Sequence, residues 1–226
     1  MSTNTLSALT DVFAAPQQVF LSIRNRTLSP WWPLLILIAS TLAVFGWYFF
    51  TIDLYPFMET SIQISGQVTS PEEIDLMLQN ESVIRIASVA SAGIGSLVVY
   101  LIVALYFFLA ATLVAEEKFS FGQCLSLVAW GSLPGLISIL SSAVSYGLAD
   151  GFVYLTDIDK TSLASLLNMT YDEANFDVAS ALTVGNVWAY ALYGYGFSVL
   201  TRSSVTTATI VGLIPPLLHY GLTYLL

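Results

Sequence analysis

The sequence predicts an all-α, polytopic membrane protein with five transmembrane helices and an N-terminal amphipathic helix at the membrane interface. The first observation is composition: 56% of the 226 residues are apolar and 9% are charged. Soluble domains carry about 25% charged residues. The second observation is that the apolar residues form runs of about 20, the length that crosses a hydrocarbon core. Such a chain cannot cover a soluble surface.

Residues 1–30 are expected to form a cytoplasmic segment that contains the amphipathic helix. Pro16 suits the first position of a helix. Val19, Phe20 and Ile23 then share one helical face. We expect this short helix to lie in the interface of the inner leaflet.

Residues 31–226 are expected to form one transmembrane domain. Trp31 and Trp32 mark the headgroup level at its start. The fourth span is the least apolar, so we expect it to face other helices rather than lipid. The predicted spans cover about 31–52, 86–115, 122–147, 179–200 and 206–226.

The basic residues predict the orientation, because cytoplasmic connections carry an excess of Lys and Arg. With the N-terminus inside, the inner segments carry Arg24, Arg26, Lys118 and Arg202. The outer segments carry Arg85 and Lys160. We therefore expect a cytoplasmic N-terminus and a periplasmic C-terminus, in a bacterial inner (plasma) membrane.

Three helix starts carry the capping-box spacing, a Ser or Thr followed three residues later by Glu or Gln. Two lie in the outer loops and one opens the third span. The pairs are Ser70 with Glu73, Ser120 with Gln123, and Thr170 with Glu173.

Small residues recur at intervals of four in two spans, which lets helix backbones approach one another. The ridges either join helices within one bundle or form a subunit interface of a homo-oligomer. They are Ala87, Ser91 and Gly95 in the second span, and Ala181, Gly185 and Ala189 in the fourth.

Prolines lie inside two spans. Pro134 falls past the middle of the third span, and Pro215 and Pro216 interrupt the fifth. Each removes a backbone donor and should kink its helix. Kinks can simply fit helices together, but broken helices can also expose carbonyls to a transported ion.

No acid or base lies well inside a span, whereas ion-coupled pumps keep titrating groups at depth. The intramembrane polar candidates are Asn186 and His219. We expect Asn186 to bond to another helix. We expect His219 to be a neutral, hydrogen-bonded packing residue, with a titrating site as the alternative.

The sequence favours neither catalysis nor cofactor binding. It holds one cysteine, Cys124, and one histidine, and it has no phosphate-binding glycine loop. We expect no metal, no cofactor and no enzymatic activity. Six basic residues and a net charge of −9 also argue against a nucleic-acid partner.

The connection between the second and third spans carries an unusual charge pattern. Glu116 and Glu117 lie at a helix C-terminus, where acids oppose the helix dipole. Lys118 is adjacent, and Arg202 lies in the only other predicted inner connection between spans. We predict that one glutamate approaches Arg202 and ties the two connections together or presents a docking surface.

Three stretches carry a family resemblance: "DVFAAPQQVFLSIRNR", "EEKFSFGQCLSLVAWGSLP" and "LTRSSVTTATIVGLIPPLL". The layout resembles the Yip domain family (Ypt/Rab-interacting membrane proteins), in particular its prokaryotic branch. The eukaryotic members carry "DLYGP" before the first span. This chain has "DLYPF" at 53–57, after that span, which we interpret as coincidence.

The resemblance implies an inner-membrane protein, and the residues suggest how it acts. We expect a non-enzymatic scaffold or membrane-organising protein that contacts the lipid bilayer and a protein partner at its cytoplasmic face. The alternative is a small oligomeric transporter or channel that uses the kinked third and fifth spans.

Overall fold

The computed structural model describes residues 5–115 and 117–225, and these residues are helical apart from turns and one isolated β-bridge. Four helical segments are long and apolar enough to cross a membrane. They match four of the five predicted spans: α3 (Trp31–Thr51), α6 (Glu81–Val114), the joined α7 (Phe121–Gly131) and α8 (Leu136–Gly147), and α12 (Val205–Leu225).

The predicted fourth span is divided between α10 (Phe176–Ala181) and α11 (Val184–Thr201). It is not among the four segments above, so the count of five is not confirmed. The expectation that this segment faces other helices is confirmed. Leu192, Tyr193 and Phe197 of α11 are buried, because α11 contacts α2 (Pro16–Arg24), α7 and α12.

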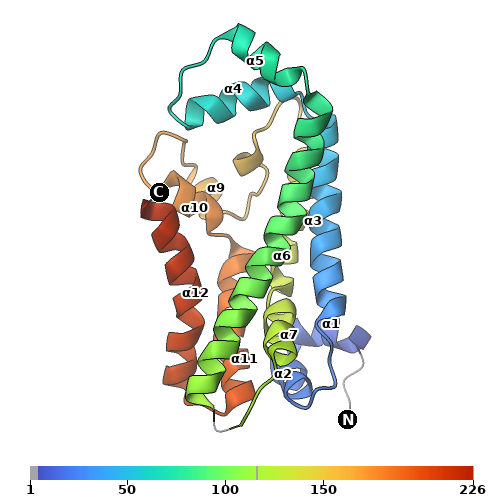
Figure 1. Ribbon diagram of the computed structural model, residues 1–226, viewed down its shortest axis with the longest axis vertical. Helices are drawn as coiled ribbons and strands as arrows, with labels where there is room; N and C mark the ends of the chain where they lie inside the picture. Colours follow the sequence, from blue (N-terminus) through green and yellow to red (C-terminus); the bar gives the residue numbers. More distant parts are fainter. Residues whose placement is uncertain (1–4, 116, 226) are drawn as a thin grey trace.

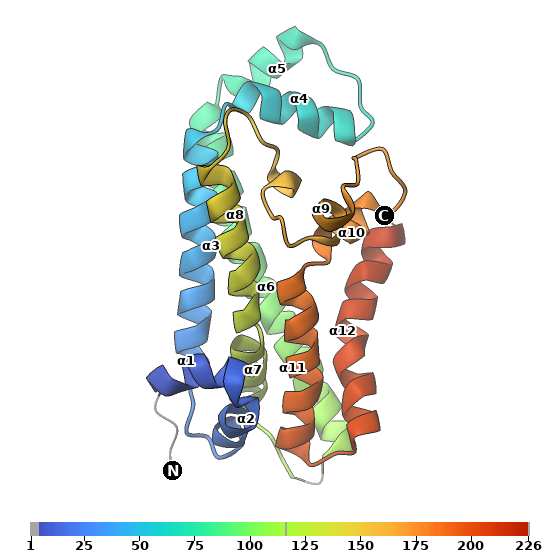
Figure 2. The same cartoon turned by 180° about the vertical axis from the view of Figure 1, so that it is seen from behind.

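The two ends of the bundle differ (Figures 1 and 2). One end carries α2 and the α6–α7 and α11–α12 connections, and we call it the inner end. The other, outer end carries four short helices and the C-terminal end of α12. These helices are α4 (Leu54–Ile64), α5 (Pro71–Leu78), α9 (Leu163–Leu167) and α10.

The outer connection 148–183 folds back against the bundle. Its short 3₁₀ turn η2 (Leu155–Asp157) leads into Ile158, which is 2% exposed and packs with Tyr48 and Phe49 of α3. The Tyr48 hydroxyl donates to the carbonyl of Val153 at 2.9 Å. The connection therefore packs against the outer end of α3.

Two of the three predicted capping boxes are confirmed. Ser70 and Ser120 each accept from the backbone N–H three residues on, at 3.3 Å, and the partner side chain returns the bond. The third predicted pair, Thr170 with Glu173, forms a hydrogen bond but does not cap a helix. Glu173 accepts from the N–H of Thr170 at 2.9 Å, but α10 starts only at Phe176, so the pair closes a turn.

The coincidence assigned to "DLYPF" also has a local explanation. Asp53 is the N-cap of α4, and its carboxylate accepts from the N–H of Tyr55 at 3.0 Å. A carboxylate at this position satisfies a helix donor that has no partner within the helix. Helix α4 was not among the elements predicted from the sequence.

The intrahelical prolines behave differently from one another. Pro134 lies in the 3₁₀ turn η1 (Leu133–Gly135), which separates α7 from α8 as predicted. Pro215 and Pro216 lie within α12, and the helix continues through both. The fifth span is therefore continuous through both prolines, and the kink expected there stays a prediction.

Candidate functional site

Three charged side chains from separate segments meet at the inner end. Both carboxylate oxygens of Glu117 accept from Nη2 of Arg24 at 2.9 Å. Nη1 of Arg202, at the end of α11, lies 3.7 Å from Oε1 of Glu117. The predicted approach of Glu117 to Arg202 is therefore present, and Arg24 is an additional partner. Glu116 lies outside the described residues.

The two ion pairs differ in strength. The Arg24 side chain is 11% exposed and the Glu117 side chain is 57% exposed, so their ion pair is shielded from water on the Arg24 side. The Arg202 side chain is 75% exposed, and such surface pairs contribute about 0–1 kcal/mol. Lys118 is exposed, and no ion pair of it is found within the described residues. Glu117 thus mainly anchors α2.

Side chains of α7 also bind the N-terminal segment through its backbone. Nε2 of Gln123 donates to the carbonyl of Arg24 at 2.9 Å. Farther along α7, Oγ of Ser126 donates to Leu28 at 3.3 Å, and Nε1 of Trp130 donates to Ser29 at 3.1 Å. We call these three bonds the clasp. They fix the path of the chain between α2 and α3.

The clasp was not among the contacts predicted from the sequence, although the sequence carries a signal for it. The three donors, at 123, 126 and 130, follow the i, i+3, i+7 spacing of one helical face. Polar side chains on one face of an otherwise apolar span predict a polar neighbour. The sequence does not say which segment supplies that neighbour.

The apolar face of α2 is buried by the bundle. Val19, Phe20 and Ile23 are at most 1% exposed, and α2 packs against α11 and α7. The preceding helix α1 (Thr5–Ala14) contributes the buried Val12. The face that the sequence analysis assigned to the membrane interface therefore belongs to the protein core.

The intramembrane polar candidates do not meet one another in a site. Nδ2 of Asn186 donates to the carbonyl of Ala181 at the end of the preceding α10, at 2.9 Å, so it caps a local turn. His219 is exposed on α12, and its ring centroid lies 5.0 Å from that of Tyr220. Among the described residues its imidazole has no hydrogen bond, unlike the packing histidine expected.

The small-residue ridge of the fourth span packs within the bundle. Gly185 and Ala189 are buried, and Ala181 is half-buried. A Cβ atom at Gly185 would lie 2.7 Å from the carbonyl oxygen of Pro134. The ridge therefore allows α11 to pass close to η1.

The ridge of the second span does not pack within the described bundle. Ala87, Ser91 and Gly95 are exposed, and nothing lies within 4 Å of a Cβ atom added at Gly95. Instead α6 turns Gly93 inward, where a Cβ atom would lie 2.6 Å from Leu42. The exposed ridge is left for lipid or another chain.

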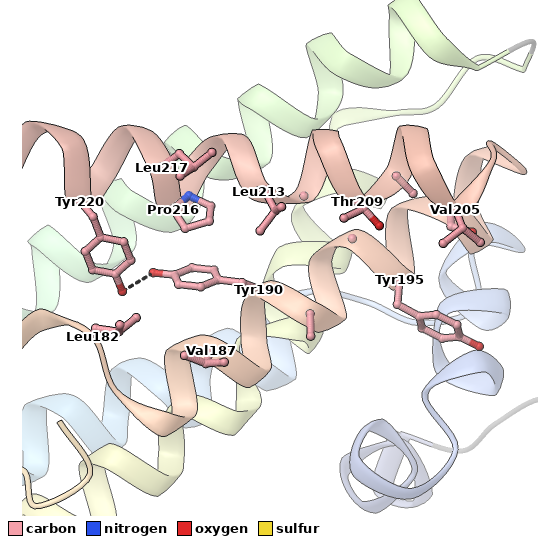
Figure 3. Close-up of a pocket in the computed structure, with 15 residues that line it drawn as sticks. Leu182, Val187, Tyr190, Tyr195, Val205, Thr209, Leu213, Pro216, Leu217 and Tyr220 are labelled. Atoms are coloured by element: carbon pink, nitrogen blue, oxygen red, sulfur yellow. Dashed lines mark hydrogen bonds between the residues drawn. The ribbon is translucent and has the colours of Figure 1, made fainter. Parts of the chain in front are cut away.

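A groove of about 660 Å³ runs between α11 and α12 (Figure 3). Gly194, Ala208 and Gly212 are among its lining residues, which are mostly apolar. Toward its outer end the hydroxyls of Tyr190 and Tyr220 lie 3.1 Å apart and form a hydrogen bond. Neither Asn186 nor His219 lines it.

Among the described residues, no group of three or more His, Cys, Asp or Glu side chains could hold a metal ion. Cys124 is a free thiol, and it is buried at the inner end of α7. The arrangement at the inner end consists of ion pairs and backbone hydrogen bonds that join segments. Such contacts can hold the joined segments in place as a binding surface.

Comparison with known protein families gives a match over nearly the whole chain. The family described as the Yip1 domain matches residues 10–226. No curated protein and no solved structure matches the chain significantly.

Proposed function

Since the chain belongs to the Yip1 domain family, we propose that it is a non-enzymatic integral membrane protein that binds a protein partner at its cytoplasmic face. The observation that carries this proposal is the gathering of α2, the α6–α7 connection and the α11–α12 connection around Glu117. A partner bound at this end would contact all three of these segments.

The proposed topology has five crossings, with α11 as the fourth. Its 18 residues span about 27 Å, close to the roughly 30 Å of a hydrocarbon core. Its lower apolarity is tolerated because its neighbours cover much of it. The excess of basic residues on the inner segments supports a cytoplasmic N-terminus. We propose a bacterial inner membrane as its location.

Cysteine labelling on the two sides of α3 tests the proposed orientation of the first crossing. In a Cys124→Ala background, Asn25→Cys should react only after the membrane is permeabilised, and Gln67→Cys should react from outside in intact cells. Both positions are exposed in the structure. The same side for both would refute the proposed orientation.

The surface around Lys118 and Arg202 is the proposed partner contact. Both side chains are exposed, and they flank Glu117. A photoreactive residue at Lys118 should capture a defined cytoplasmic protein in cells, whereas one at Gln67 on the outer end should not. Capture of the same proteins from both positions, or of none, would count against partner binding.

A flux assay separates the scaffold from a small oligomeric transporter or channel. The groove between α11 and α12 is mostly apolar and does not include Asn186 or His219, which supports the scaffold. Purified protein in liposomes should pass ions and small solutes no faster than empty vesicles. Flux above that level would replace the scaffold by a transporter.

A further inference from the structure

We propose that the groove between α11 and α12 binds an anionic phospholipid of the inner leaflet. One acyl chain would lie along the groove, and the phosphate would meet Arg202. The inference rests on the membrane insertion proposed above. It shares Arg202 with the proposed partner contact, but lipid retention by the purified protein is measured without that partner.

The dimensions of the groove suit an acyl chain. Its volume of about 660 Å³ lies within the range of small-molecule sites. The lining of α12 runs from Val205 to Tyr220 (Figure 3), about 22 Å of helix. One leaflet contributes about half of the roughly 30 Å hydrocarbon core, so the groove is long enough for a chain that enters from the inner side.

The shape of the groove favours a flexible chain over another helix. The small residues needed for helix association are already used between α11 and α12, since a Cβ atom at Gly212 would lie 2.6 Å from Cα of Gly194. The exposed lining is bulky instead: Val187, Leu213 and Leu217 are 47–67% exposed. These side chains would hold a second helix away from the floor.

Charge places the headgroup at the inner end. Arg202 lies three residues before Val205, which opens both α12 and the groove. Its side chain is 75% exposed, and its one ion-pair partner in the described chain, Glu117, is already bound by Arg24 through both oxygens. The positive end of the α12 dipole lies at the same place and also favours an anion.

The outer end of the groove offers no comparable charge. Its polar groups there are the hydroxyls of Tyr190 and Tyr220, which bond to each other at 3.1 Å. A phosphate would therefore be attracted to the inner end. This orientation agrees with the anionic surface of a cytoplasmic leaflet.

Lipid retention measured by native mass spectrometry tests the headgroup contact. The protein is taken from nanodiscs of equal phosphatidylglycerol and phosphatidylcholine. We expect the wild type to retain phosphatidylglycerol preferentially, and Arg202→Ala to weaken that retention about tenfold, as for the loss of a charged hydrogen bond. Arg202→Lys should retain part of the preference.

Arg26→Ala is the matched control for charge and backbone. Arg26 and Arg202 are both exposed at the inner end, and both have a left-handed backbone, with φ of 59° and 56°. Arg26→Ala should retain phosphatidylglycerol as the wild type does. Equal losses in the two variants would mean unspecific attraction and would overturn the site.

Filling the groove tests the acyl-chain contact. Thr209 lines the groove and is exposed, so Thr209→Trp should release both lipids. Leu109→Trp, on the exposed face of α6, should release neither. Retention by Thr209→Trp would overturn the proposal. Resistance to carbonate extraction is measured for each variant, so a failure of insertion is distinguished from a failure of the lipid site.

Discussion

Replacing Gln123 by glutamate tests whether the clasp holds the N-terminal segment separately from the cap of α7. Gln123 has two roles: its Oε1 accepts from the N–H of Ser120 at 3.0 Å, and its Nε2 donates to the carbonyl of Arg24 at 2.9 Å. A glutamate keeps the acceptor and loses the donor. The cap of α7 should therefore remain while one bond of the clasp is lost.

The expected effect follows from the burial of the bond. Gln123 is 6% exposed, so the carbonyl of Arg24 would lose its partner away from water. A buried polar group without a partner costs about 1–3 kcal/mol, and the carboxylate would repel the carbonyl. We expect the N-terminal segment to open more readily by about 2 kcal/mol, which is roughly 30-fold in population.

Hydrogen exchange in nanodiscs measures this opening. Amides of 17–29 should exchange faster in Gln123→Glu, whereas the first turn of α7 should not change. Gln123→Ala removes both bonds and should accelerate exchange in both regions. Gln79→Glu, on the exposed end of α5, is the surface control.

Two results would refute the reasoning. One is wild-type exchange at 24–29 in Gln123→Glu, which would mean that the bond does not hold the segment. The other is the same amide exchange in Gln123→Glu and Gln123→Ala, which would mean that the cap of α7 and the clasp bond cannot be removed separately.

Three further outcomes follow from other contacts. Gly212→Ala should lower the free energy of unfolding by about 1–2 kcal/mol because its Cβ would meet the α11 backbone. Gly95→Ala, on open surface, should raise the free energy of unfolding by about 0.5–1 kcal/mol. Denaturant unfolding in micelles measures both variants against the wild type. Hydrogen bonds from Thr69 and the N-cap backbone lower the pKa of Glu73. Their stabilisation of α5 is therefore present above the ordinary glutamate pKa and is lost as pH falls. Amide exchange in α5, corrected for intrinsic rates, should show this pH dependence in the wild type and not in Glu73→Gln. Arg85 donates to the terminal carbonyls of α3, so Arg85→Ala should destabilise the protein by about 1–3 kcal/mol. In a melting assay Arg85→Lys should be destabilised as well, because lysine lacks the forked donors of arginine.

The sequence predicted best what local chemistry decides. The capping boxes at Ser70 and Ser120 form because donor and acceptor are three residues apart and need no other segment. The apolar runs likewise predicted the four segments that can cross a membrane. The turn at Pro134 follows from a missing N–H within one helix.

The sequence predicted less well what depends on which face turns inward. Gly93 and Gly95 are two residues apart, so they point about 200° apart around the helix. Spacing alone favoured the ridge through Gly95, but packing against Leu42 uses Gly93. Similarly, Arg202 was the expected partner of Glu117, while the docked position of α2 brings Arg24 closer.

The amphipathic pattern of α2 fits two environments, and the clasp helps to decide between them. Val19, Phe20 and Ile23 could enter the bilayer interface or the bundle, and either would remove their apolar area from water. Because the apolar gain is similar in both, the hydrogen bonds from α7 and the ion pair of Arg24 favour the bundle.

Loss of the Gln123 bond of the clasp should therefore shift α2 toward the membrane surface rather than into water. A polarity-sensitive fluorophore on Leu21→Cys in a Cys124→Ala background reports the environment of the partly exposed face of α2. In Gln123→Glu the emission should shift to the blue, and lipids that carry quenchers should reduce it more than in the wild type. A shift to the red would show that α2 moves into water. The free energy of burying its apolar face would then not be similar in the bundle and in the membrane interface.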